Sequence, residues 1–164
     1  DSEMQDNSLY QFSGHSDLWI AELIWKWAPD GNFRERNLVL QSEFLYRRED
    51  GGLNLDDTTG DSSGNYRGSQ DGFYAQAVYQ FMPRWRAGVR YDQLWSDNRV
   101  RGLDSDALDT GDDPSRVSAM IDFSNSEFSR FRLQWNRQWG GLDGNDAVFL
   151  QYILSLGSHG AHAY

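Results

Sequence analysis

Charged side chains at alternating positions carry most of the chemistry that this sequence offers. Of its 15 basic residues only Lys26 is a lysine, so arginine dominates. Arginine stays charged and can grip a carboxylate or a phosphate with two nitrogens, which would favour anions in a pore. The alternative is that the arginines pair with acids and only brace a wall. The candidate pore-lining residues are Arg47, Arg86, Arg90, Arg116, Arg130, Arg132, Glu43, Asp92 and Asp122.

Metal binding is a second chemistry to weigh. The aspartates of the acidic stretch that ends at Asp113 offer the hard oxygen ligands that Ca²⁺ prefers, but their spacing does not match an EF-hand, so a solvated loop is the alternative. His159 and His162 could share a metal, although two imidazoles are too few for a closed Zn²⁺ site. Both histidines are therefore weak metal candidates. The alternative is that they belong to a tail that only completes the last strand. We expect no cofactor.

Hydrolytic catalysis is not expected of this chain. A hydrolase needs a histidine that is positioned by an acid or amide beside a nucleophile or a water. Ser13, His15 and Asp17 are too close in sequence to form a triad without a sharp bend. The chain is therefore not predicted to be an enzyme.

The charged residues must be positioned by β-strands, and the stretch from Gly72 to Trp95 shows the pattern of two such strands. Apolar or aromatic residues occupy every second position over residues 73–81, and again over residues 85–91 after a break that contains Pro83. A period of two indicates strands with one apolar face, and the proline predicts a turn. Each strand is about ten residues long and its apolar face begins and ends with aromatics, which is typical of a transmembrane β-hairpin.

Five further segments show the same alternation, and the connections between them vary in a regular way. The segments are residues 18–27, 37–47, 116–123, 130–136 and 148–156. Residues 1–16 are predicted to be loop, and residues 49–70 and 96–114 are predicted to be long extracellular loops, because outer-membrane barrels alternate short periplasmic turns with longer external loops. These features favour an all-β fold, an antiparallel transmembrane β-barrel of about seven strands, over a soluble β-protein.

Composition agrees with a barrel and excludes other classes. Aromatic residues make up 15% of the chain while the mean hydropathy is −0.74, which suits strands with aromatic belts and argues against transmembrane helices. The absence of cysteine excludes disulfides and thiolate metal sites. A net charge of −10 argues against a nucleic-acid partner. The expected partner is a lipid bilayer.

Several segments resemble the C-terminal part of a family of Gram-negative outer-membrane proteins. Members are porin-like, similar to the phosphate-selective porins, and are sometimes labelled TonB-dependent or zinc-regulated receptors. The segments that carry the resemblance are residues 17–21, 25–32, 79–85 and 126–132 and the closing stretch 149–162. The resemblance implies a whole barrel larger than this piece and supplies no catalytic residues. The terminal aromatic, Tyr164, partly resembles the signal read by the outer-membrane assembly machinery.

The sequence therefore predicts a porin-like channel in the outer membrane of a Gram-negative bacterium. It would pass small solutes passively, with anions favoured if the arginines are free. The alternative is an outer-membrane receptor, transporter or structural barrel with a closed lumen, with a link to metals among its possibilities. Residues 1–164 are expected to be the C-terminal portion of one outer-membrane β-barrel domain, because a single-chain bacterial barrel has an even number of strands and both termini in the periplasm. Its remaining strands would complete the two edges, since unpaired edges are costly in lipid.

Overall fold

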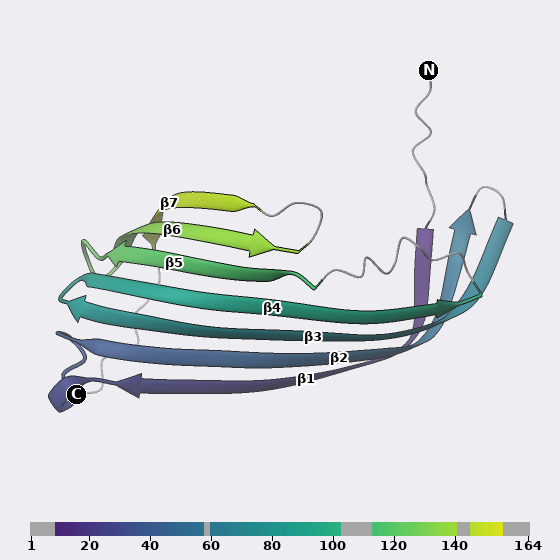
Figure 1. The fold of residues 1–164 in the computed structure, drawn as a ribbon, viewed down its shortest axis with the longest axis horizontal. Helices are drawn as coiled ribbons and strands as arrows, with labels where there is room; N and C mark the ends of the chain where they lie inside the picture. Colours follow the sequence, from purple (N-terminus) through teal and green to yellow (C-terminus); the bar gives the residue numbers. More distant parts are fainter. Residues whose placement is uncertain (1–8, 58–59, 103–112, 141–144, 156–164) are drawn as a thin grey trace, which may run out of the picture. The chain divides into compact units, whose positions relative to one another are not determined.

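The computed structural model describes residues 9–57, 60–102, 113–140 and 145–155, and nearly all of them lie in β-strands (Figure 1). A short 3₁₀ turn, η1 (Pro29–Gly31), follows the first strand. No helix in these ranges is long and apolar enough to cross a membrane. The strands are β1 (Leu9–Trp27), β2 (Asn37–Asp57), β3 (Gly60–Met82), β4 (Trp85–Arg101), β5 (Ser115–Phe123), β6 (Ser129–Trp139) and β7 (Asp146–Leu154).

The strands form one antiparallel sheet in which each strand pairs with its neighbours in sequence. The order is β1-β2-β3-β4-β5-β6-β7, so the all-β, antiparallel class predicted from the sequence is confirmed. Within the described residues β1 and β7 are the two edges, and the sheet is not closed as a barrel. Closure by further strands and insertion into a membrane remain predictions.

Two tight turns lie where the sequence predicts them. Between β1 and β2, Asp30 and Gly31 have positive φ angles of 52° and 72°. Between β3 and β4, Arg84 has a φ of 72° directly after Pro83. Glycine tolerates this left-handed region and aspartate enters it more readily than most residues, whereas a two-residue hairpin turn imposes it on Arg84.

The prediction of loops at residues 1–16, 49–70 and 96–114 is wrong wherever the structure has strands instead. Residues 9–16, 49–57, 60–70 and 96–101 lie in strands, whereas residues 1–8, 58–59 and 103–112 fall outside the described ranges. Alternating apolar residues are not the only source of strand stability, because a strand can also be held by polar pairs with its neighbours. Arg67 binds Asp50 at 2.7 Å, and the Tyr66 hydroxyl donates to Asn98 at 2.9 Å.

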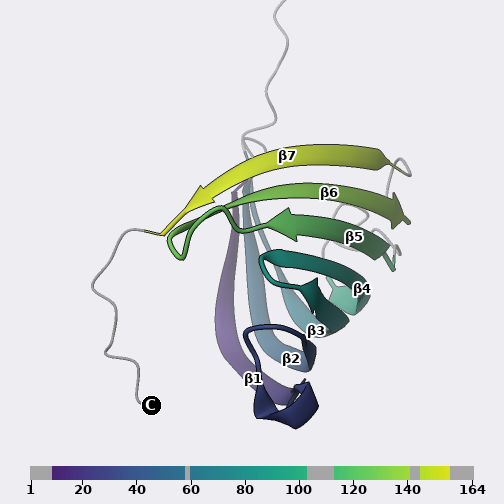
Figure 2. The ribbon, with the colours of Figure 1, turned by 90° about the vertical axis from the view of Figure 1, so that its left-hand side faces the viewer.

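The contacts divide the sheet into two compact units, which are described separately. The first unit comprises Asp1–Ala21, Phe44–Phe73 and Gln93–Pro114; the second unit comprises Glu22–Glu43, Tyr74–Asp92 and Ser115–Tyr164. In the second unit, neighbouring strands follow a curve rather than a flat layer (Figure 2).

Close contact between backbones marks the first unit. A Cβ atom added to Gly14 would lie 2.6 Å from the Cα of Gly51, and a Cβ on Gly51 would lie 2.7 Å from the Cα of Gly14. The ring of Phe12 lies over this glycine pair and meets Tyr66 edge to face, with 5.7 Å between ring centroids. Only glycine leaves room for the two backbones to approach this closely. The ring of Phe12 covers the space that side chains at positions 14 and 51 would otherwise fill.

The strand register of the second unit separates two faces. Phe131 pairs with Phe123 on one side and Tyr152 on the other, and the next residue, Arg132, pairs with Asp122 and Gln151. Because side chains alternate along a strand, the aromatic row and the charged row point to opposite faces. We call these the apolar face and the polar face.

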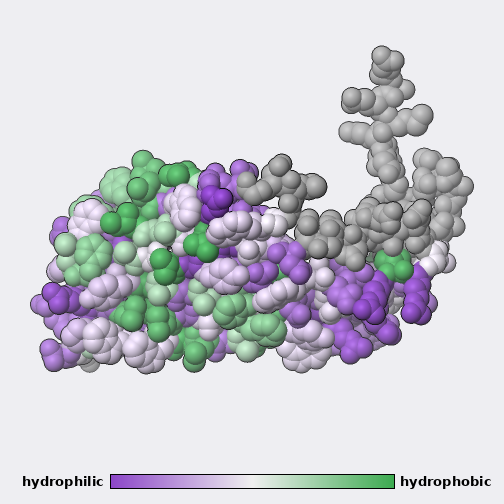
Figure 3. Space-filling model, in the orientation of Figure 1, coloured by the Kyte–Doolittle hydropathy of each residue, from purple (hydrophilic) through white to green (hydrophobic). Residues whose placement is uncertain are grey.

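The burial of the two faces is the reverse of that in a soluble protein. Leu133, on the apolar face, is 49% exposed, whereas the carboxylate of Asp122 on the polar face is fully buried. Along β4, from Trp85 to Asp92, every apolar-face residue is exposed and every polar-face residue is half-buried. Figure 3 shows apolar side chains, in green, at the surface of the second unit. Soluble domains bury apolar groups and expose charged ones, so this sheet has its polarity inverted.

Candidate functional site on the polar face

Asp122 is the centre of a charged cluster on β4, β5 and β6. Its Oδ1 accepts a hydrogen bond from Arg132 Nε at 2.7 Å, and its Oδ2 accepts one from Arg132 Nη2 at 3.0 Å. Arg86 Nη2 donates to the same Oδ2 at 3.1 Å. Arg132 therefore binds with both arms of its guanidinium, the geometry that arginine and carboxylate favour, and Arg86 adds a second ion pair.

A second cluster surrounds Asp92 on β4. Arg90 donates to Asp92 Oδ1 through Nε at 2.8 Å and through Nη2 at 2.6 Å. Arg116 Nε lies 3.5 Å from Asp92 Oδ2, across the strand pair. The guanidinium of Arg90 also lies over the ring of Tyr74, 3.9 Å from its centroid, a cation–π contact. Arg90 is thus fixed by an anion and by an aromatic ring.

A network of amide, hydroxyl and carboxylate groups continues from Tyr74 toward β1. The Tyr74 hydroxyl donates to Glu43 Oε2 at 3.1 Å and accepts from Gln41 Nε2 at 2.9 Å. Gln41 Nε2 also donates to Glu22 Oε1 at 3.0 Å, and Gln76 donates to Gln41 Oε1 at 2.8 Å. In the second unit, the polar face of β1 and β2 therefore carries the carboxylates of Glu22 and Glu43, whereas its arginines lie on β4, β5 and β6 together with Asp92 and Asp122.

A polar hollow of about 450 Å³ lies between the two arginine clusters. Its lining includes Arg90, Arg116 and Arg132 together with the amides of Gln76 and Gln134. Glycine at position 88 keeps the hollow open, since an added Cβ would lie 2.7 Å from Met120 Cε and 3.2 Å from the carbonyl oxygen of Ala77. The lining can donate many hydrogen bonds to a small polar solute but offers no nucleophile paired with a base.

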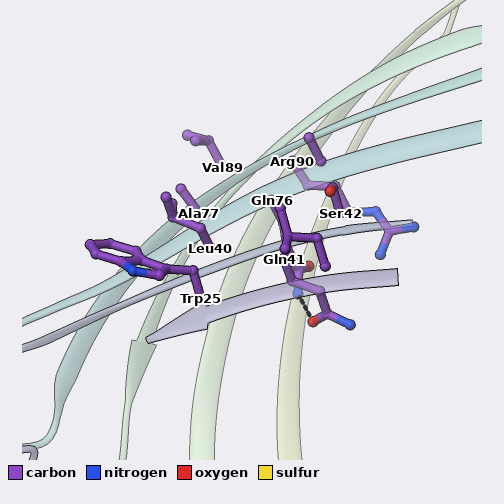
Figure 4. A pocket seen from close by; sticks show the side chains of 10 residues that line it. Trp25, Leu40, Gln41, Ser42, Gln76, Ala77, Val89 and Arg90 are labelled. Atoms are coloured by element: carbon purple, nitrogen blue, oxygen red, sulfur yellow. Dashed lines mark hydrogen bonds between the residues drawn. The ribbon is translucent and has the colours of Figure 1, made fainter. Parts of the chain in front are cut away.

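A larger hollow, about 640 Å³, lies on the apolar face. Figure 4 shows Trp25, Leu40, Ala77 and Val89 on one side of the strands, while Gln41 turns to the other side. The small side chains of Ala75 and Ala77 make room between these larger neighbours. This hollow has no charged group on its own face and is suited to contact with hydrocarbon.

Arg47 belongs to the first unit and has a separate set of partners. It forms an ion pair with Glu49, which is buried, and its Nε donates to Ser16 Oγ at 3.3 Å. Tyr66 lies in the same unit, where burial, followed by the negative charge of Glu49, raises the pKa of its hydroxyl. Both causes favour the neutral hydroxyl over the phenolate.

The structure brings together most of the residues that the sequence selects. Arg86 and Arg132 meet Asp122, Arg90 and Arg116 meet Asp92, and Glu43 joins the tyrosine network. A prediction based on charged residues misses Gln41, Tyr74 and Gln76. Alternation nevertheless places them on the polar side of their strands, because Gln41 lies two residues before Glu43, and Tyr74 and Gln76 alternate with the apolar residues 73, 75 and 77.

The metal candidates gain no structural support. His159 and His162 lie outside the described residues, as do most of the aspartates before Asp113. In the part of the chain that is described, no three histidine, aspartate or glutamate side chains gather to hold a metal ion.

Comparisons with known proteins leave the family open. No protein-family model matches the chain, and no solved structure matches it. A protein of Aquifex aeolicus (strain VF5), named only as uncharacterized, is 32% identical over 162 residues, which cover 94% of this chain and 32% of that protein. The chain thus spans about a third of the length of the curated relative it matches.

Proposed function

We propose that this sheet forms part of the wall of a porin-like channel in the outer membrane of a Gram-negative bacterium. The inverted polarity of the sheet carries this proposal. Exposed apolar and aromatic side chains need a nonaqueous partner, and a lipid bilayer supplies one. The polar face would then line a water-filled lumen for the passive passage of small solutes.

The spacing of aromatic residues on β6 supports a membrane span. Phe131 and Trp139 lie on the apolar face eight residues apart, or about 27 Å along a strand. Tilted strands of this length cross an apolar band of roughly 25 Å that is flanked by aromatic girdles. At one end a row of rings crosses four strands, with centroid distances of 4.9 Å for Trp85–Phe123 and 4.8 Å for Phe131–Tyr152.

A second candidate function is an outer-membrane receptor, transporter or structural barrel with a closed lumen. The observation in its favour is that Asp122 and Asp92 each bind two arginines, as expected of a braced wall. Ion pairs of this kind hold strands in register without any requirement for an open pore.

Conductance separates the two candidates. The full-length protein that contains this chain, refolded into lipid, should produce stepwise ion currents across a planar bilayer. Gln134→Trp adds bulk to the lining of the polar hollow and should lower the unit conductance, whereas Leu133→Trp, one residue away on the apolar face, should leave it unchanged. A correctly refolded protein that passes no current would favour the closed lumen.

A further inference from the structure

The hollow of about 640 Å³ on the apolar face lies within the second unit and has no part in the proposed passage of solutes. Small, half-buried side chains line its base: Ala75 and Ala77 on β3 and Ser42 on β2. Larger side chains that are between 39% and 67% exposed surround it: Leu23 and Trp25 on β1, Leu40 on β2 and Val89 on β4. The hollow is therefore a depression in a surface of large apolar side chains (Figure 4).

The polar residues that border the hollow already have partners on the polar face. Gln76 donates to Gln41 Oε1 at 2.8 Å, and Gln41 donates to the Tyr74 hydroxyl at 2.9 Å. Arg90 binds Asp92 at 2.6 Å. None of the residues that line the hollow has a buried side-chain nitrogen or oxygen without a hydrogen bond. An occupant of the hollow therefore needs no polar group, and hydrocarbon fits it.

Packing, rather than exclusion of water, would hold hydrocarbon in this depression. Within a bilayer the lipid tails are as apolar as the protein surface, so association depends on van der Waals contact. A flat surface contacts a chain on one side only, whereas a depression contacts it on several sides, and a gap left unfilled forfeits those contacts. A flexible acyl chain can follow the depression, whereas a second copy of this sheet would have to match it with a protruding side chain.

Three arginines lie in the turns at the end of the strands that form the hollow. Arg34 and Arg36 precede β2, Arg84 lies between β3 and β4, and all three are exposed. None of them forms an ion pair with another described residue. The same turns contain two acids, Asp30 and Glu35, so they are net positive in a chain whose net charge is −10. Exposed cations at the surface of a bilayer attract anionic headgroups.

The spacing between these turns and the hollow matches the dimensions of a lipid. Leu40 follows Arg36 by four residues, which is about 13 Å along an extended strand. Each leaflet of a bilayer contributes about 15 Å of hydrocarbon. A lipid whose phosphate lies beside the turns would therefore place an acyl chain over the hollow.

We propose that the hollow binds one acyl chain of a glycerophospholipid whose phosphate contacts the arginines of the adjacent turns. The small side chains of Ala75 and Ala77 give the chain its place between the larger neighbours. The arginines distinguish a phosphate-bearing lipid from a neutral one. This inference rests on the proposed membrane location, since it assumes that the apolar face meets a bilayer.

Retention of lipid by the full-length protein in detergent tests the site without relying on conductance. The probe is dioleoyl phosphatidylglycerol, and native mass spectrometry counts the molecules that stay bound. Ala77→Leu fills the hollow and should lower retention by about fivefold or more, because the chain loses its contacts. Ala119→Leu makes the same exchange on the apolar face of β5, outside the hollow, and should change retention less than about twofold.

The role of the arginines is tested with dioleoylglycerol, which has the same chains and no phosphate. The native protein should retain phosphatidylglycerol better than dioleoylglycerol. A variant that combines Arg34→Gln, Arg36→Gln and Arg84→Gln should retain the two lipids equally. A native protein that retains both lipids equally would overturn the assignment of the phosphate to these turns.

A second filling variant, Ala75→Leu, keeps the test decisive if Ala77→Leu fails to refold. Equal retention by the native protein and by refolded variants with a filled hollow would overturn the site. A native assembly that retains no lipid and dissociates in Ala77→Leu would assign the hollow to a second copy, and would overturn it too. Protein that conducts but retains no phosphatidylglycerol contradicts the lipid site alone, whereas failure to insert into phosphatidylglycerol vesicles contradicts the membrane location as well.

Discussion

Asp122 is a charged residue that has lost all contact with solvent, and two arginines replace that contact. Removing a charge from water is expensive, and ion pairs with good geometry recover the cost. The bidentate bond from Arg132 and the additional bond from Arg86 supply this recovery across three neighbouring strands. Asp122 is therefore expected to hold the register of β4, β5 and β6.

Asp122→Asn should destabilise the protein by about 3 kcal/mol, because it leaves two partly buried arginines without their counter-charge. Unfolding by urea in lipid vesicles measures the change. Asp97→Asn is the matched control, since Asp97 pairs with Arg99 on an exposed stretch and surface pairs contribute little. Similar losses in both variants would contradict the special role of Asp122.

At the scale of the strands, the sequence predicts where each strand lies and which residues share a face better than it predicts how long each strand is. Alternation locates all seven strands, because one face of each is apolar and the period of two is strong. It fails at the polar ends of β1, β2, β3 and β4, where Arg67–Asp50 and Tyr66–Asn98 bonds replace apolar contacts. Such pairs depend on neighbours far away in sequence, so no local pattern reveals them.

The candidate site was predictable to a similar degree. Alternation places Arg86, Arg132 and Asp122 on one face, but the choice of partners depends on strand register. Sequence alone does not show that Arg132 rather than Arg130 takes the carboxylate of Asp122. That difference decides which arginine braces the strands through an ion pair.

The assignment of residues to the apolar and polar faces leads to a separate prediction. Leu40→Arg or Val89→Arg places a charge on the apolar face and should cost ~2–4 kcal/mol near the midplane of a bilayer. Gln41→Arg, one residue from Leu40, adds a charge beside Glu22 on the polar face and should be milder. Refolding yields and unfolding midpoints in lipid give the comparison. Equal damage at positions 40 and 41 would refute the assignment of the faces.

At the scale of the molecule, two features matter most: the open edges, and the excess of five arginines over two aspartates on the polar face of β4, β5 and β6 in the second unit. β1 and β7 each have one side without a strand among the described residues, and lipid would make such edges costly. Further strands would relieve that cost. The channel would then have a wall whose charge on β4, β5 and β6 is positive.

Ion selectivity tests that charge. Replacement of Arg86, Arg90, Arg130 and Arg132 by glutamine should shift the reversal potential in a salt gradient toward cations, because the lumen loses positive charge. The measurement needs the full-length protein in a planar bilayer. An unchanged reversal potential accompanied by lower stability would mean that these arginines only brace the wall.

The separation of acids from arginines on the polar face has a consequence for uncharged molecules as well. On the strands of the second unit, Glu22 and Glu43 lie on β1 and β2 beside one cation, Lys26, and the arginines of the polar face begin at Arg86 on β4, so an electric field runs along this part of the sheet from one group to the other. A field of this kind turns a dipole. A zwitterion near this face would point its carboxylate toward β4–β6 and its ammonium toward β1 and β2, and would therefore cross the proposed channel in one preferred orientation.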